Sequence, residues 1–271
     1  MAREGTTPDF IEALARGLEV IAAFSARCPE MSLSQVAEAT GLARPTARRI
    51  LLTLQELGYV RTGTGTGAGR YALTPRVLDL GVAYVRSSGL WEVARPHMER
   101  LVGQTRESCS IAQLDGSDIV YVARVAVPKI VTLAVQIGTR FPAPQTSLGK
   151  VLLAALGPGE LARVLAEPSR SGVVITRPTG PEALAGELRE VRARGWALAD
   201  EELAPGIRSV SAPLRDGEGR VIAALNVNAH AAETSVDRLV EHHLPLLLQA
   251  AGEIGADFAR LAAVPQVTVG A

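Results

Sequence analysis

Apolar residues in the first part of the chain recur every three to four positions, which predicts three successive helices. The first is expected over residues 9–27, and its apolar stripe consists of Phe10, Leu14, Leu18, Ile21 and Ala22. The second is expected over residues 34–40 and ends at Gly41, which can take the left-handed conformation of a helix end. The third begins near Pro45, because a first helical turn tolerates proline, and reaches Leu57. Residues 32–61 are therefore predicted to form a helix-turn-helix.

The third helix has two contrasting faces at about 100° per residue. One face carries the apolar residues Ala47, Ile50, Leu51, Leu54 and Leu57. The opposite face carries Arg44, Pro45, Arg48, Arg49 and Glu56. An apolar back with an arginine-bearing front is typical of a helix that enters a DNA major groove. A solvated face on an ordinary small domain would show the same charges, so charge alone leaves both interpretations open.

Two short strands joined by the glycine-rich segment GTGTGAG follow over residues 59–73 and predict a wing. The glycine-rich segment leads into a strand and lacks the Gly-Lys-Ser/Thr ending of a phosphate-binding loop. Arg61 and Arg70 at the base of the wing suit contacts with a DNA backbone. Residues 75–87 form a further amphipathic helix with a stripe of Leu78, Val82 and Val85, a face that would pack on the same helix of a second chain.

The remainder of the chain alternates helices with strands that include two hairpins, over residues 110–125 and 207–228. Further strands are expected over residues 130–137 and 196–201, a loop over residues 138–144, and a closing helix over residues 235–261 that bends at Pro245. These elements predict an α+β fold with an antiparallel sheet covered by helices. The expected domains are 8–74, a linker helix over 75–89, and 90–263.

Composition adds limits on location and chemistry. The chain has 271 residues, 47% of them hydrophobic and 21% charged, with a net charge of zero. The segment 41–76 nevertheless carries six arginines against one acid, which concentrates positive charge where DNA binding is predicted. Cys28 and Cys109 are far apart and suit free thiols in a reducing cytoplasm. Without an apolar signal segment or a membrane span, a cytoplasmic protein is expected.

Candidate enzyme and metal sites are weak. Ser147 and Lys150 have the Ser-x-x-Lys spacing of penicillin-recognising enzymes, but the chain has no Lys-Thr-Gly element to complete that site. Ser147 is expected to cap a helix, with Lys150 facing outward. The four histidines, at 97, 230, 242 and 243, have no metal-ligand spacing. We therefore expect neither an enzyme nor a bound metal or cofactor.

Four segments resemble the IclR family of transcriptional regulators along almost the full length of the chain. They are LARPTARRILLTLQELGYV, RYALTPRVLDLG, FPAPQTSLGKVLLAAL and RGWALADEELAPGIRSVSAPLRDGEGRVIAALNV. The resemblance implies a winged helix-turn-helix, a linker helix used in dimerisation, and a GAF-like α/β domain that binds a small effector. Dimers of the family often pair into tetramers. The runs VYVARV and GTRFPAPQTSLGKVLLA are similar to those of regulators of aromatic-acid catabolism, of the protocatechuate and 4-hydroxybenzoate type.

The predicted function is regulated binding to a double-stranded DNA operator. The residues expected to contact DNA are Ser34, Arg44, Pro45, Thr46, Arg48, Arg49, Arg61 and Arg70. The alternative is a small-molecule-binding module whose helix-turn-helix serves protein interaction and not DNA binding.

The effector is expected to be a small carboxylate. Backbone N–H groups of Ser147 and Leu148, at a helix start, suit a carboxylate. Asn226 and Asn228 alternate on one strand and so face the same side, although both amides could instead bond neighbouring backbone. The resemblance adds Ser209, with Ile130 and Leu133 as the pocket floor. Arg124 and Arg140 are expected to act as carboxylate clamps, and Asp200 is expected near the mouth of the pocket. Each of these three charged residues could instead be solvated.

Overall fold

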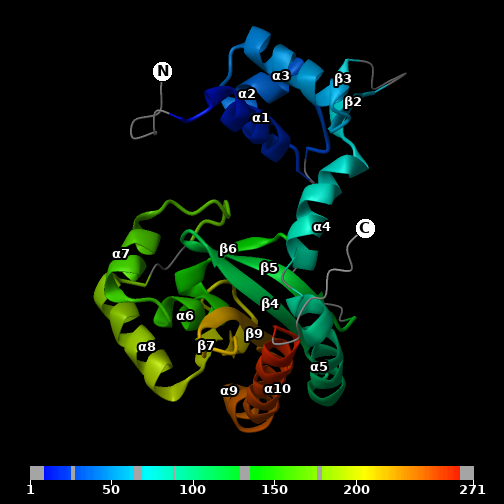
Figure 1. Ribbon diagram of the computed structural model, residues 1–271. Helices are drawn as coiled ribbons and strands as arrows, with labels where there is room; N and C mark the ends of the chain where they lie inside the picture. The colour runs from blue at the N-terminus through cyan, green and yellow to red at the C-terminus, as the bar shows by residue number, and fades with distance from the viewer. Residues whose placement is uncertain are drawn as a thin grey trace. The chain divides into compact units, whose positions relative to one another are not determined.

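The computed structural model describes residues 9–25, 28–63, 69–87, 89–128, 135–175 and 179–262 (Figure 1). The chain divides into two compact units, and the division falls between Ser87 and Ser88. The described part of the chain confirms the predicted fold class: a winged helix-turn-helix, then a helix, then an α/β unit built on an antiparallel sheet.

The described part of the N-terminal unit begins with three helices and a small sheet, which precede α4. The helices are α1 (Glu12–Ala23), α2 (Leu33–Thr40) and α3 (Arg44–Glu56). The strands β1 (Glu30–Ser32), β2 (Val60–Thr62) and β3 (Arg70–Leu73) form a sheet in the order β1-β3-β2. Strand β1 was not predicted, because a three-residue strand is too short to show alternation. Helix α1 is also shorter than predicted at both ends.

Local sequence signals explain the helix-turn-helix. The Ser32 hydroxyl accepts from the backbone N–H of Gln35, whose side chain accepts from the N–H of Ser32, so α2 begins with a capping box. Gly41 ends α2 in the left-handed conformation, with φ of 66°. Pro45 lies in the first turn of α3 as predicted. The three helices meet at buried Val20, Val36 and Leu51.

A short 3-10 turn, Pro75–Val77, leads into α4 (Leu78–Ser87). The large apolar side chains of α4 are exposed within the chain: Leu78, Leu80, Val82 and Tyr84. A helix with this much exposed apolar surface needs a covering partner.

The C-terminal unit contains a sheet in the order β6-β5-β4-β9-β8-β7, antiparallel throughout. Its strands are β4 (Ser108–Asp115), β5 (Asp118–Val125), β6 (Arg140–Pro142), β7 (Ala197–Asp200), β8 (Ile207–Arg215) and β9 (Val221–His230). Its helices are α5 (Leu90–Thr105), α6 (Ser147–Ala154), α7 (Pro158–Ala166), α8 (Pro181–Arg194), α9 (Val236–Arg238) and α10 (Leu244–Ala262).

Helices cover both faces of this sheet and create two separate cores. On one face, Ile111, Leu225 and Val227 pack with residues of α5 and α10. On the other face, α6 packs over the strands, β8 and β9 above all, and α8 packs on α6 (Figure 1). All eight residues of α6 are buried. Helix α6 is thus fixed between the sheet and α8, which holds its first residues in a defined position over the strands.

Two predicted elements differ from the observed ones, and a third lies mostly outside the described residues. The segment predicted as a proline-rich loop over residues 138–144 contains β6 and a 3-10 turn, Ala143–Gln145. The predicted strand over 130–137 lies mostly outside the described residues, and its described part is not a strand. The irregularity near Pro245 is a π-helical turn over Leu239–His243 that precedes α10, consistent with the missing proline N–H.

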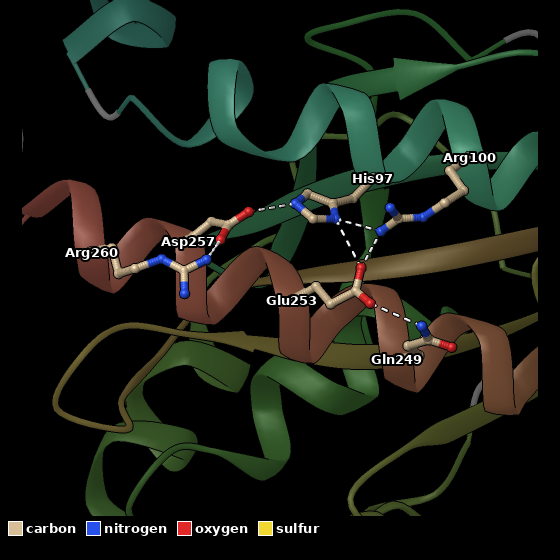
Figure 2. Close-up of polar contacts among 6 residues, drawn as sticks. All are labelled: His97, Arg100, Gln249, Glu253, Asp257 and Arg260. Carbon is tan, nitrogen blue, oxygen red and sulfur yellow. Dashed lines mark hydrogen bonds and ion pairs between the residues drawn. The ribbon is translucent and has the colours of Figure 1, made fainter.

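A cluster of charged groups joins α5 to α10 (Figure 2). His97 of α5 is 12% exposed, with its Nδ1 3.1 Å from Glu253 Oε2 and its Nε2 2.7 Å from Asp257 Oδ2. Arg100 pairs with Glu253 and Arg260 with Asp257. The bond with His97 is the main cause that holds the pKa of Asp257 below its ordinary 3.8. The pKa of Glu253 lies below its ordinary 4.5, chiefly through a bond from the Gln249 side chain.

This cluster predicts an acid-sensitive contribution to stability. Because the folded-state pKa values of Asp257 and Glu253 are depressed, their contribution is complete above the ordinary carboxyl values and disappears as pH falls through the folded values. We expect His97→Leu to lower Tm by roughly 2–4 °C at neutral pH. The gap from wild type should close toward pH 3 in thermal melts across the pH range. A gap that stays constant with pH would assign the effect to packing.

Candidate functional site

The arginine face of α3 is the first candidate site. Arg44, Arg48 and Arg49 are exposed, and none of them forms an ion pair with another described residue. Behind them, the buried side chains of α3 are Ala47, Leu51 and Leu54. Three cations with no acid partner on one helix can accept phosphate or base contacts without breaking existing pairs.

The other predicted DNA contacts lie around α3. Pro45 is exposed and Thr46 half-buried in the first turn of α3, and Ser34 is exposed in the first turn of α2. Glu30 of β1 meets both arginines of the wing. Its carboxylate lies 3.8 Å from Arg61 Nη2, and its carbonyl oxygen accepts from Arg70 Nη2 at 2.6 Å. The wing arginines are therefore partly neutralised, unlike those of α3. The tip, residues 64–68, lies outside the described part of the chain.

The N-terminal unit also carries an apolar groove of about 820 Å³ between α1 and α3. Its apolar lining residues are Leu14, Leu18, Ile21, Ile50, Leu54, Leu57, Tyr59 and Leu80. The predicted stripe of α1 is largely exposed along this groove, whereas that of α3 is buried at Ala47, Leu51 and Leu54 and exposed only at its end. Leu14 is 61% exposed and Leu57 is 49% exposed.

The second candidate site lies on the α6 face of the large sheet. Strand register places Ser110 of β4 opposite Arg124 of β5, and also opposite Asn226 of β9. Asn226 in turn lies opposite Ser211 of β8. Directly opposed residues of antiparallel strands share a face. The next row on this face contains Ser108, Asn228, Ser209 and Ala199. A polar patch therefore lies beneath the first turn of α6.

A small cavity of about 20 Å³ lies at this patch. It is lined by Tyr121, Gln145, Thr146, Ser147, Leu148, Ala199, Glu202, Leu203, Ile207, Ser209, Asn226 and Asn228. Five of the predicted effector residues thus come together here: Ser147, Leu148, Ser209, Asn226 and Asn228.

Hydroxyl groups close on one another at the start of α6. Ser147 Oγ lies 2.6 Å from Ser209 Oγ and 2.7 Å from Ser211 Oγ. The helix cap is Thr146, whose hydroxyl accepts from the N–H of Gly149 at 2.9 Å, so the expectation that Ser147 caps the helix is wrong. The N–H groups of Ser147 and Leu148 have no acceptor among the described residues. These two donors and the positive end of the helix dipole favour an anion.

The two asparagines differ in their partners. Asn226 is buried, and its Oδ1 accepts from the N–H of Ser110 at 2.9 Å, so the alternative of a backbone partner holds for this atom. Asn228 hydrogen-bonds the Tyr121 hydroxyl. Burial raises the pKa of Tyr121 to about 12, so the phenol stays protonated. The site therefore presents a neutral hydroxyl and amides next to the free N–H groups of α6.

Three of the remaining predicted effector residues, Arg124, Arg140 and Asp200, do not line the cavity. Arg124 Nη1 donates to Ser110 Oγ at 3.2 Å, and Arg124 has no carboxylate partner among the described residues. Burial lowers the pKa of the Arg124 guanidinium. Arg140 pairs with Asp115 at the hairpin turn. Asp200 is exposed and pairs with Arg208 at 2.8 Å. The predicted floor residues Ile130 and Leu133 lie outside the described residues.

Lys150 corrects another expectation, because it does not face outward. Its side chain is 4% exposed, and its Nζ lies 2.7 Å from both carboxylate oxygens of Glu202. Glu187 of α8 supplies a second carboxylate at 2.8 Å. Lys150 is therefore a buried cation that joins α6, α8 and the loop after β7, and Glu202 connects it to the cavity wall.

Several lining residues were missed from the sequence, among them Tyr121, Gln145, Glu202, Leu203 and Ile207. Tyr121 faces the cavity because a bulge in β5, at Val122, resets its pairing with β4 between Ile111 and Ala112. No local pattern reveals that bulge.

The described residues contain no cluster of three or more His, Cys, Asp or Glu able to hold a metal. None of the helices searched in this part of the chain is both long and apolar enough to cross a membrane.

Comparisons with known proteins agree with both halves of this architecture. Residues 13–63 match the IclR helix-turn-helix domain, and residues 82–256 match the C-terminal domain of the bacterial transcriptional regulator IclR. The chain is 39% identical over 249 residues to the Pca regulon regulatory protein of Pseudomonas putida, covering 91% of this chain and 84% of that protein.

One further relative is named for an aromatic acid, and another was crystallised with one. The p-hydroxybenzoate hydroxylase transcriptional activator of Acinetobacter baylyi is 33% identical over 258 residues, covering 93% of this chain and 94% of that protein. An IclR homolog of Microbacterium hydrocarbonoxydans was crystallised with 4-hydroxybenzoate and is 27% identical to this chain. The two structures match with a TM-score of 0.77 over 92% of this chain and 99% of the homolog's chain. The homologues are named as regulators and not as enzymes. The chain belongs to the IclR family of bacterial transcriptional regulators.

Proposed function

We propose that this regulator binds a double-stranded DNA operator through α3 and the wing. The observation that carries the proposal is the set of exposed arginines on α3, at 44, 48 and 49, without acid partners among the described residues. Arginine forms bidentate contacts with guanine and phosphate, and the second helix of a helix-turn-helix is the element that enters the groove. Ser34, Pro45, Thr46, Arg61 and Arg70 complete the contact surface.

The DNA-binding form is a homodimer, which can pair further into a tetramer. Support comes from the apolar surface that the single chain leaves uncovered, on α4 and along the groove between α1 and α3. A second copy of the chain supplies the matching apolar surface by symmetry. A dimer also presents two copies of α3 to paired half-sites. Sedimentation should give at least twice the 28.5 kDa mass of the chain.

The effector that controls operator binding is a small carboxylate, and an aromatic acid is the favoured class. Support comes from the two free N–H groups at the start of α6, from the buried amide of Asn226, and from the Tyr121 hydroxyl. Arg124, two strands away on the same face, adds positive potential. Relatives are named for p-hydroxybenzoate and Pca regulation, and one was crystallised with 4-hydroxybenzoate.

The experiment that tests the proposal is a titration of the protein onto the promoter DNA adjacent to its own gene, with and without 4-hydroxybenzoate. Binding that responds to the acid supports both functions. Acid binding in calorimetry without any DNA binding would favour the alternative, a ligand-binding module whose helix-turn-helix serves protein interaction. Operator binding that no aromatic or aliphatic carboxylate alters would remove the effector class.

A pair of substitutions at Asn226 separates folding from ligand binding. Asn226→Leu leaves the buried N–H of Ser110 without its acceptor, so we expect a stability loss of about 1–3 kcal/mol together with weaker effector binding. Asn226→Asp retains an acceptor for Ser110 but replaces the amide donor with a carboxylate that repels an anion. We expect Asn226→Asp to reduce 4-hydroxybenzoate affinity more than Asn226→Leu does. Calorimetric affinities unchanged in both variants would place Asn226 outside the site.

A further inference from the structure

The effector cavity is almost filled by the protein itself. Its volume of about 20 Å³ is close to that of a site for one water molecule. Sites for small organic ligands are typically about 300–1,000 Å³. An aromatic acid can therefore enter only if part of the cavity wall moves.

The lining residues differ in how firmly they are held. Asn226 lies on β9, a strand paired on both sides, and Ser147 belongs to the fully buried α6. Glu202 and Leu203 instead belong to the loop over 201–206, between β8 and the edge strand β7. Glu201 at the start of this loop has φ of 57°, a left-handed conformation that is unfavourable for a residue with a side chain. This part of the described wall belongs to no helix or strand, and its bonds are those of a loop, such as the one from the Glu201 N–H to the Ile207 carbonyl oxygen at 2.8 Å.

The loop is held in place by Lys150. Both oxygens of Glu202 lie 2.7 Å from Lys150 Nζ; the Lys150 side chain is 4% exposed, and the Glu202 side chain is 29% exposed. The ammonium group also contacts Glu187, so one positive charge faces two carboxylates. A third negative charge entering this region would raise the electrostatic energy, because a single cation cannot compensate it.

We propose that Glu202 is an internal competitor of the effector: its carboxylate, paired with Lys150, occupies the negatively charged position in the cavity wall that the effector carboxylate takes when it binds the N–H groups of Ser147 and Leu148. This inference rests on the proposed effector function of the cavity. When the effector replaces Glu202, the number of carboxylates around Lys150 remains two, and the loop 201–206 moves away to open the cavity. Carboxylates are thereby selected over neutral analogues of the same shape. Occupancy of the site becomes linked to the position of the loop between β7 and β8.

The test compares Glu202→Gln with wild type by calorimetry, with 4-hydroxybenzoate and the neutral 4-hydroxybenzamide as probes. Glutamine keeps the size of the side chain and removes its charge. If the closed form outweighs the open one by about ten to one, loss of the competitor lowers the Kd for 4-hydroxybenzoate about tenfold. The Kd for the benzamide should change much less, because a neutral group does not compete for Lys150.

Glu187→Gln is the matched control. Glu187 contacts the same ammonium group but does not line the cavity. Its neutralisation removes one negative charge near Lys150 but leaves Glu202 in place as the competitor, so any gain in 4-hydroxybenzoate affinity should be much smaller than that of Glu202→Gln. Circular dichroism and thermal melts confirm that each variant is folded. Glu202→Asp, which withdraws the carboxylate by one methylene, replaces Glu202→Gln if that variant does not fold.

The outcomes separate this inference from the proposed function. Tighter binding of 4-hydroxybenzoate by Glu202→Gln, or binding by the variant alone, supports Glu202 as a competitor. If wild type binds the acid and Glu202→Gln binds it equally or more weakly, the competitor role is overturned while the effector function stands. If neither protein binds the acid nor any other small carboxylate, both the inference and the effector function are overturned.

Discussion

The double variant Arg48→Ala, Arg49→Ala should lose operator binding while it keeps its fold and its effector affinity. Both side chains are exposed on α3, and neither stabilises the domain through an ion pair among the described residues. Each arginine contact to a base is worth about 1–3 kcal/mol, and a dimer loses two copies of each. We therefore expect at least a roughly 100-fold loss of affinity in fluorescence anisotropy with operator DNA.

Salt dependence and a charge-matched control make this result specific. Where an arginine contacts phosphate, its removal should lower the slope of log affinity against log salt by about one. Arg95→Ala with Arg163→Ala removes the same charge from exposed positions on α5 and α7, with side chains 61% and 67% exposed. This control should bind the operator nearly as wild type does. Equal losses in both double variants would mean that net charge, and not the α3 surface, drives binding.

The helix-turn-helix was predictable because its signals are local. Gly41 and Pro45 define the turn and the start of α3 through backbone preferences, and the arginine face follows from helical periodicity. The pairing of Arg61 and Arg70 with Glu30 was not predictable. It depends on β1, a short strand that joins the wing from a distant part of the sequence. The sequence therefore indicates which face is basic but not which of its charges are already neutralised.

The effector site was predictable only where it depends on alternation within one strand. Asn226 and Asn228 share a face because β9 is regular around them. The contact of Ser147 with Ser209 and Ser211 depends on how α6 is placed over β8, which no local pattern encodes. The burial of Lys150 likewise depends on α8 and on the loop after β7.

Charge partners explain why only one of the two candidate arginine clamps remains near the site. Arg140 is held by Asp115, whose pKa lies below its ordinary 3.8 chiefly because of that bond. Arg124 has a serine hydroxyl as its partner instead. An arginine already paired with a carboxylate would have to break that pair to bind a ligand, whereas Arg124 would not. Spacing along the chain gives no indication of this difference.

Gly149→Ala should be the most disruptive single-methyl substitution in the effector unit. A Cβ at Gly149 would lie 2.0 Å from the carbonyl oxygen and 2.4 Å from the Cα of Ala143. These are backbone atoms of the 3-10 turn before α6, and the N–H of Ala143 is bonded to the carbonyl oxygen of Ser117 at 2.9 Å. The methyl group can be accommodated only if α6 or that turn shifts. Ala143→Gly removes a side chain and not the clashing atoms, so it should not rescue the variant.

We expect Gly149→Ala to cost about 3 kcal/mol or more, as overpacking of a rigid core does, and to lower Tm by roughly 6–12 °C. The shift of α6 should also remove effector binding, because Ser147 and Leu148 belong to its first turn. Gly103→Ala on α5 is the matched control: no atom beyond the adjoining backbone of its own helix lies within 4 Å of its Cβ position, so the same change should stabilise by up to about 1 kcal/mol. Thermal melts and calorimetry measure both effects. A Gly149→Ala protein that melts and binds 4-hydroxybenzoate as wild type does would show that the close approach of α6 to Ala143 does not position the site.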